Sequence, residues 1–151
     1  MTVTVSRLCP TPLPLNRLQA IAECYAAQLK LKRWEVSCLF VDDKTMRRLN
    51  KQYKKHDYAT DVLSFPQVTS RQIKSSKQKT PGLLGDIVIS VDTARKNAKL
   101  FKNTIKRELA LYVAHGLLHL NGLRDDTDRA KKIMRKEEEK LLAAVCKKEL
   151  L

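Results

Sequence analysis

The chain has 151 residues, 43% of them hydrophobic, and its 30 Lys and Arg against 16 Asp and Glu give a formal net charge of +14 at pH 7. This length suits one domain with a buried core, and this composition excludes a disordered tail. The longest mostly apolar stretch, residues 109–120, is too short to cross a membrane, and the N-terminus lacks the apolar run of a secretory signal, so we expect a single cytoplasmic domain over residues 1–151.

The first half of the chain is predicted to alternate between strands and helices. Residues 2–5 alternate weakly in polarity, as an edge strand does. Apolar residues at helical spacing predict a helix from about residue 15 to 30, and a period of two predicts a strand over residues 34–41. Asp42 or Asp43 is placed to cap the helix that follows this strand.

A polar and basic segment interrupts the middle of the chain. A short strand is predicted over residues 61–65, and Pro66 stops it. Residues 67–82 hold almost no large apolar side chains, which predicts a long loop that is either functional or disordered. A functional loop could close over RNA with its cations, which are Arg71, Lys74, Lys77 and Lys79.

One strand and three helices are predicted after this segment. The strand covers residues 85–90, and the first two helices cover residues 91–101 and 104–121. Gly122 ends the second of these helices, and a third helix fills the C-terminal part. Strands interleaved with helices predict an α+β fold with a small mixed four-stranded sheet covered by about five helices.

Basic residues are concentrated in the middle of the sequence. Residues 44–107 hold 16 of the 30 Lys and Arg but only four of the 16 acids. In the rest of the chain, positive and negative charges are therefore nearly equal in number. A surface that served only solubility would mix the two signs more evenly, although that alternative stays open. The pattern favours a polyanionic partner, with nucleic acid ahead of a membrane surface.

Two histidines carry a metal-binding pattern. His115 and His119 lie four residues apart within a predicted helix, so both imidazoles can face one site and supply two ligands to a zinc ion. Gly122 can turn the chain back toward them, which makes Asp125 the natural third ligand. The spacing is that of the metzincin motif His-Glu-x-x-His-x-x-Gly-x-x-His. The turn and the carboxylate favour a metal over two incidental histidines.

Gly116 stands where the metzincin motif has its Glu general base. Without that carboxylate, hydrolysis of peptides by the same route is disfavoured. A glycine at this position either leaves space for substrate beside the metal or serves close packing of the helix.

Three blocks of sequence, in this order, resemble the bacterial YbeY family of zinc-dependent endoribonucleases, which are implicated in ribosomal RNA maturation. They are Thr-Asp-Val-Leu-Ser-Phe-Pro at residues 60–66, Gly-Asp-Ile-Val-Ile-Ser at residues 85–90, and Val-Ala-His-Gly-Leu-Leu-His-Leu-Asn-Gly at residues 113–122. The resemblance covers about residues 34–145. It implies a zincin-like α+β fold, one metal ion on the helix that ends at Gly122, single-stranded RNA as substrate, and a ribosomal partner.

The third ligand departs from the family pattern. That ligand is usually a His, whereas this chain reads Gly122-Leu-Arg-Asp125. A carboxylate can ligate zinc, but two His and one carboxylate also suit manganese or iron(II). Asp126 and Asp128 are alternative ligands if Asp125 points away.

A second departure concerns the expected phosphate contact. The family segment Asn-x-x-Tyr-Arg is represented here by residues 50–54, where Lys54 keeps the positive charge but loses the planar fork of Arg. We expect Lys54 to be catalytic, because its charge can compensate that of the phosphoryl oxygens. Lys51, Lys55 and Ser64 are expected to contact the substrate.

Other polar residues near these motifs leave alternatives open. Asp61 either forms a hydrogen bond to a metal-binding side chain or stabilises a turn, and the turn is favoured. Glu108 either orients an imidazole or is solvated beside Arg107, which is the safer interpretation. His56 is expected on the surface.

The resemblance implies a metal-dependent endoribonuclease of ribosomal RNA maturation and ribosome quality control, and the concentration of basic residues fits this; we expect no DNA specificity and no membrane partner. The alternative is a ribosome-associated RNA-binding assembly factor whose metal is structural. A metalloprotease is less favoured because of Gly116.

Overall fold

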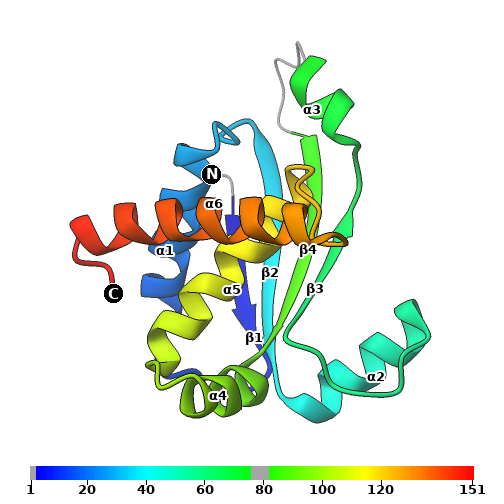
Figure 1. The fold of residues 1–151 in the computed structure, drawn as a ribbon, viewed down its shortest axis with the longest axis vertical. Helices are drawn as coiled ribbons and strands as arrows, with labels where there is room; N and C mark the ends of the chain where they lie inside the picture. The colour runs from blue at the N-terminus through cyan, green and yellow to red at the C-terminus, as the bar shows by residue number, and fades with distance from the viewer. Residues whose placement is uncertain (1–2, 76–81) are drawn as a thin grey trace.

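The computed structural model describes residues 3–75 and 82–151 (Figure 1). Within them, the strands are β1 (Val3–Arg7), β2 (Trp34–Val41), β3 (Val62–Pro66) and β4 (Gly82–Ser90). The helices are α1 (Leu15–Gln28), α2 (Asp43–Lys54), α3 (Ser70–Ser75), α4 (Val91–Leu100), α5 (Ile105–Leu120) and α6 (Asp128–Lys147). The predicted α+β class is confirmed, with six described helices where about five were expected.

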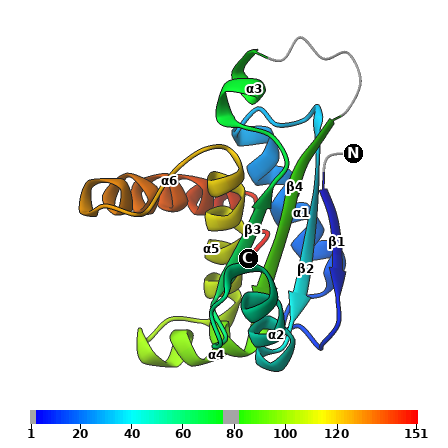
Figure 2. The same cartoon turned by 90° about the vertical axis from the view of Figure 1, so that its right-hand side faces the viewer.

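The four strands form one mixed sheet in the order β1-β2-β4-β3. β1, β2 and β4 are parallel, and β3 pairs with β4 in the antiparallel direction, so β3 is an edge strand. Figure 2 shows α5 and α6 stacked on one side of this sheet. α5 also packs against β3, so this helix lies next to the edge of the sheet.

The alternation along β2 divides its buried side chains between two apolar clusters. Cys38 and Phe40 belong to the main core, which α1, α4, α5 and α6 share. Val41 points to the other face of the sheet, where it packs with Met46 of α2. Because successive side chains of a strand point to opposite faces, the predicted strand over residues 34–41 accounts for both clusters.

The prediction of a loop over residues 67–82 is wrong for residues 70–75 and for residue 82. α3 covers Ser70–Ser75, and β4 begins at Gly82. Thr69 starts α3 as part of a capping box: Gln72 N donates to Thr69 Oγ1 at 3.2 Å, and Gln72 Oε1 accepts from Thr69 N at 2.7 Å. Arg71 and Lys74 therefore lie on a helix, whereas Lys77 and Lys79 lie outside the described residues.

Asp43 links α2 to α4 through charged hydrogen bonds. Its carboxylate accepts from Ser90 Oγ, Thr93 Oγ1 and Lys96 Nζ, each at 2.6 Å. Burial raises the pKa of Asp43, but the three hydrogen bonds and the Lys96 charge outweigh burial and lower it below its usual 3.8. The neighbouring Asp42 caps α2, since its side chain accepts from the Thr45 amide at 2.8 Å.

We expect Asp43→Asn to lower the free energy of unfolding by about 1–2 kcal/mol near neutral pH. A carboxylate with a lowered folded-state pKa stabilises the fold above its unfolded pKa and loses that effect as the pH falls through the folded value. Urea titrations of both proteins at about pH 7 and about pH 3 should therefore show the difference shrinking in acid. An equal difference at both pH values would contradict this role for the charge.

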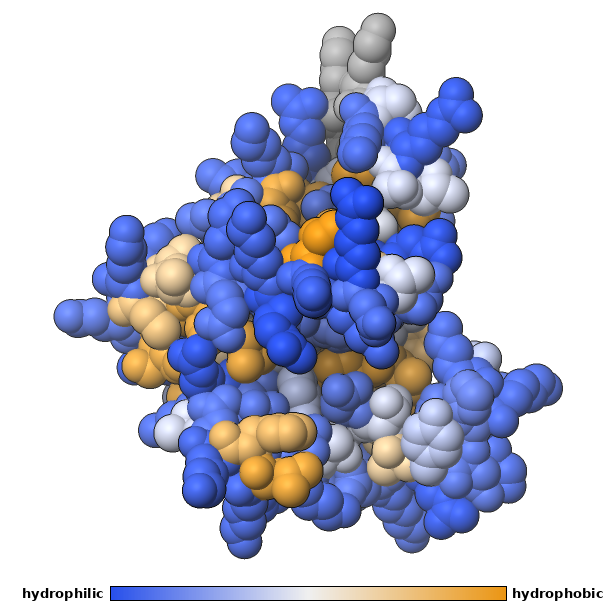
Figure 3. Space-filling view, viewed as in Figure 1, coloured by the Kyte–Doolittle hydropathy of each residue, from blue (hydrophilic) through white to orange (hydrophobic). Residues whose placement is uncertain are grey.

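Figure 3 shows a largely hydrophilic face with a hydrophobic patch near α4. Leu100 and Phe101, at the end of α4, are 71% and 67% exposed. None of the described helices is both long and apolar enough to span a bilayer.

Candidate metal centre

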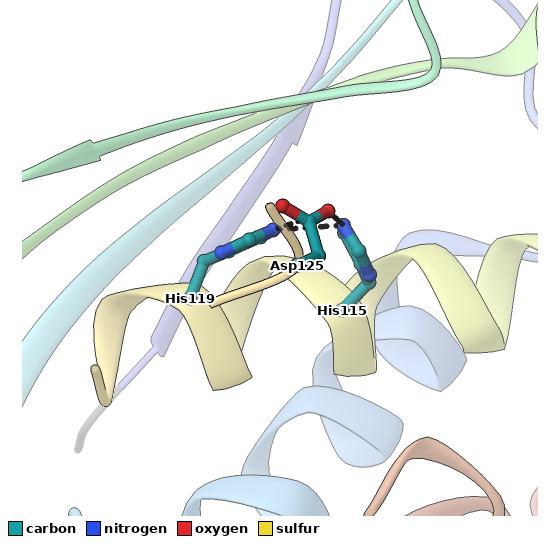
Figure 4. A group of neighbouring side chains, drawn as sticks. All are labelled: His115, His119 and Asp125. Carbon is teal, nitrogen blue, oxygen red and sulfur yellow. Dashed lines mark hydrogen bonds and ion pairs between the residues drawn. The ribbon is translucent and has the colours of Figure 1, made fainter. Parts of the chain in front are cut away.

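α5 presents two histidines on one face, one turn apart. The Nε2 atoms of His115 and His119 lie 3.0 Å from each other. The two rings are nearly perpendicular, with 85° between their planes. Figure 4 shows both rings directed at one point, together with the Asp125 carboxylate.

The chain brings Asp125 to this point by turning back after α5. Gly122 has a φ of 102°, in the left-handed region, and a Cβ on it would lie 2.5 Å from Ser70 Cβ. Asp125 Oδ2 lies 3.2 Å from His119 Nε2 and 3.5 Å from His115 Nε2. The three donor atoms all lie within 4.8 Å of one another.

Hydrogen bonds at Nδ1 leave both Nε2 atoms available to a cation. The Leu123 carbonyl lies 2.9 Å from His119 Nδ1, and Glu138 Oε1 lies 2.7 Å from His115 Nδ1. Both oxygens accept from Nδ1–H, so in the neutral imidazole the lone pair is on Nε2. These residues fit one divalent cation held by two nitrogens and a carboxylate oxygen. That donor set suits zinc and also manganese or iron(II).

Sequence reasoning missed Glu138, which α6 contributes. Both interpretations of Glu108 are wrong, because its side chain is buried and accepts from Asn103 Nδ2 at 2.8 Å. Glu138 reaches His115 from 23 residues away because α6 packs against α5. No local spacing could have indicated this contact.

Glu138 also changes the basicity of the imidazole that it contacts. Burial lowers the pKa of His115, whereas the hydrogen bond and charge of Glu138 raise it, as do the charges of Asp61 and Asp125. The net shift is upward. A carboxylate placed in this way fixes the tautomer and orientation of a ligating histidine.

We expect Glu138→Ala to weaken binding of zinc by about 100-fold and Glu138→Gln by about tenfold. The amide can still accept a hydrogen bond, but it lacks the charge. Competition with a chelating indicator measures the Kd. Glu139→Gln is the matched control, because Glu139 pairs with Arg107 and not with a histidine. Wild-type affinity in both Glu138 variants would exclude a positioning role.

Gly116 serves close packing rather than space for substrate. A Cβ at this position would lie 2.7 Å from Ile87 Cγ2. Ile87 lies in β4 and is 1% exposed. The glycine therefore lets α5 approach the sheet, which is one of the two interpretations that the sequence left open.

A cavity of about 490 Å³ opens beside His119. Its other lining residues come from α2, β3 and the segment between them: Asn50, Lys54, His56, Tyr58, Thr60, Val62, Leu63, Ser64 and Pro66. Lys54 and Ser64, which were expected to act on substrate, thus share a cavity with His119 of the candidate metal site. Lys51 and Lys55 are exposed on and after α2 but do not line this cavity.

Lys54 and Ser64, the two cavity residues that were expected to act on substrate, each have one nearby contact. Lys54 Nζ lies 5.4 Å from the centroid of the Phe65 ring. Ser64 Oγ donates to the Gly116 carbonyl at the long distance of 3.4 Å. His56 is exposed, as expected, but it also lines the cavity.

The remaining carboxylates near the cluster have other partners or positions. Asp61 Oδ1 accepts from the adjacent Val62 amide at 2.7 Å and from Thr60 Oγ1 at 3.3 Å, and its charge contributes to the raised pKa of His115. Asp126 pairs with Arg124, and Asp128 lies in the first turn of α6. Asp125 is therefore the carboxylate that the described residues bring to both histidines.

Comparisons with known proteins agree on one family. A family model described as Endoribonuclease YbeY matches residues 14–146. A Myxococcus xanthus protein named Endoribonuclease YbeY is 46% identical over 80% of this chain, and the match covers only 40% of that relative. A protein of the same name from Alkaliphilus oremlandii is 45% identical over 74% of this chain and 72% of the relative.

A solved structure has a similar fold. The solution structure of TM1509 from Thermotoga maritima matches with a TM-score of 0.63 and 25% identity, over 94% of this chain and 89% of that one. The family match covers most of the sequence, including both histidines and Asp125. The chain therefore belongs to the Endoribonuclease YbeY family.

Proposed function

We propose that this protein is a metal-dependent endoribonuclease that cleaves single-stranded RNA during ribosomal RNA maturation, with zinc as its ion. The observation that carries the proposal is the position of His115, His119 and Asp125 beside a cavity lined by Lys54. No carboxylate is among the described residues that line this cavity, which suits an anionic substrate. The names of the relatives supply the reaction class.

The side chains of the cavity have complementary roles in this proposal. A bound divalent cation supplies Lewis acidity toward phosphate oxygens and lowers the pKa of water. Lys54 adds positive charge in the same cavity, where negative charge grows on the phosphoryl oxygens. Ser64 can exchange its long hydrogen bond to the Gly116 carbonyl for one to a phosphate oxygen.

The charge of the surrounding elements supports a polyanionic substrate. α2 and the residue after it carry many cations, which are Lys44, Arg47, Arg48, Lys51, Lys54 and Lys55. Contacts of Lys and Arg with phosphates give affinity with little sequence preference and a steep dependence on salt. We therefore expect RNA affinity to fall strongly as the salt concentration rises.

The test is cleavage of end-labelled single-stranded RNA by the complete chain, with and without a chelator. We expect products that disappear with the chelator and return with added zinc, and parallel additions of manganese and iron(II) identify the preferred ion. RNA affinity without metal-dependent products would overturn the nuclease proposal in favour of an RNA-binding assembly factor. Duplex RNA and single-stranded DNA of the same sequence test the proposed substrate preference.

A further inference from the structure

We infer that His56 and Tyr58 form a stacking surface for one nucleobase of the RNA, beside the metal cluster. This inference rests on the proposed function for the identity of its ligand. Neither residue has a part in the chemistry proposed above. Both line the cavity that His119 and Lys54 also line.

The two rings form a pair that remains accessible. Their centroids lie 5.4 Å apart, and their planes are tilted by 34°. This separation is typical of aromatic pairs in contact. Tyr58 is nevertheless 56% exposed, so the pair is not part of the core. An exposed aromatic pair in a cavity offers π surface to a planar ligand.

The segment that carries the rings is fixed to α2 by four hydrogen bonds. The buried Asn50 donates from Nδ2 to the Tyr58 carbonyl at 2.9 Å, and its backbone carbonyl accepts from the His56 amide at 3.3 Å. Arg47 donates twice to the Asp57 carboxylate, at 2.8 and 3.2 Å. A segment held in this way loses little conformational freedom when a ligand stacks on it.

The charges around the rings favour a nucleotide over other planar ligands. Lys54 places a cation in the same cavity, and a phosphate beside a stacked base can contact it. Stacking on aromatic side chains is tolerant of sequence because every base has a π face. The pair should therefore hold one base next to the reacting phosphate without strong base preference.

Fluorescence of single-stranded RNA that contains 2-aminopurine tests the inference, because the emission of this base falls when it stacks. The complete chain is kept metal-free with a chelator, so that no cleavage occurs. We expect quenching with the wild type and with Tyr58→Phe. Tyr58→Leu should abolish the quenching and weaken binding about tenfold, with a smaller loss for His56→Ala.

Phe101→Leu is the matched control, because Phe101 is also an exposed aromatic residue but does not line the cavity. Unchanged quenching and affinity in Tyr58→Leu would overturn the inference, as would an equal loss in Phe101→Leu. Circular dichroism checks that the variants fold. The quenching assay and the cleavage assay test the two proposals separately. If quenching depends on Tyr58 but the metal-loaded protein does not cleave RNA, the nuclease proposal fails and the stacking site remains, on an RNA-binding protein.

Discussion

Replacing both His115 and His119 with Ala is expected to reduce the bound metal from one equivalent to none and to abolish RNA cleavage. The two Nε2 atoms lie 3.0 Å apart and supply both nitrogen donors of the cluster. Asp125 alone would remain, and a single carboxylate that is partly exposed does not hold a transition metal tightly. Elemental analysis of the purified proteins, followed by the cleavage assay, measures both effects.

The third histidine of the chain provides the control. His56 is not among the three residues of the cluster, so His56→Ala should keep the full metal content. Thermal unfolding of the double variant without metal checks that its fold persists. Equal metal content in the wild type and the double variant would remove the site, whatever the activity.

Residues close together in the sequence allowed the grouping of His115, His119 and Asp125 to be predicted. His115 and His119 are neighbours on a helix face by spacing alone, and the left-handed Gly122 returns the chain within a few residues. The capping box of Thr69 and Gln72 is equally local and could have indicated α3. The polar composition of residues 67–82 obscured that signal.

Contacts between distant elements could not be read from spacing. Glu138 meets His115 only because of the way α6 crosses α5. In the same way, the need for a glycine at position 116 depends on how closely α5 packs against Ile87 of β4. The exposed rings of His56 and Tyr58 share a cavity with His119 because the segment that carries them leads from α2 into β3, which packs against α5. Periodicity predicts the elements, but their packing decides these contacts.

Replacement of Lys54 should also have a large effect. We expect Lys54→Ala to lower the single-turnover cleavage rate by about 100-fold to 1,000-fold, with a much smaller change in RNA affinity. The physical reason is that a cation in the cavity opposes charge that is greater in the transition state than in the bound substrate. Cleavage rates at saturating protein, compared with Kd values in chelator, separate the two quantities.

Two further substitutions sharpen this test. Lys54→Arg should keep or raise the rate, because a guanidinium preserves the charge and can contact two phosphate oxygens. Lys51→Ala removes an exposed cation of the same helix that does not line the cavity, so it should weaken binding slightly and leave the rate unchanged. A rate loss in Lys51→Ala equal to that in Lys54→Ala would show that only the general charge of α2 matters. The difference between the two lysines therefore measures what the position of Lys54 in the cavity beside His119 contributes.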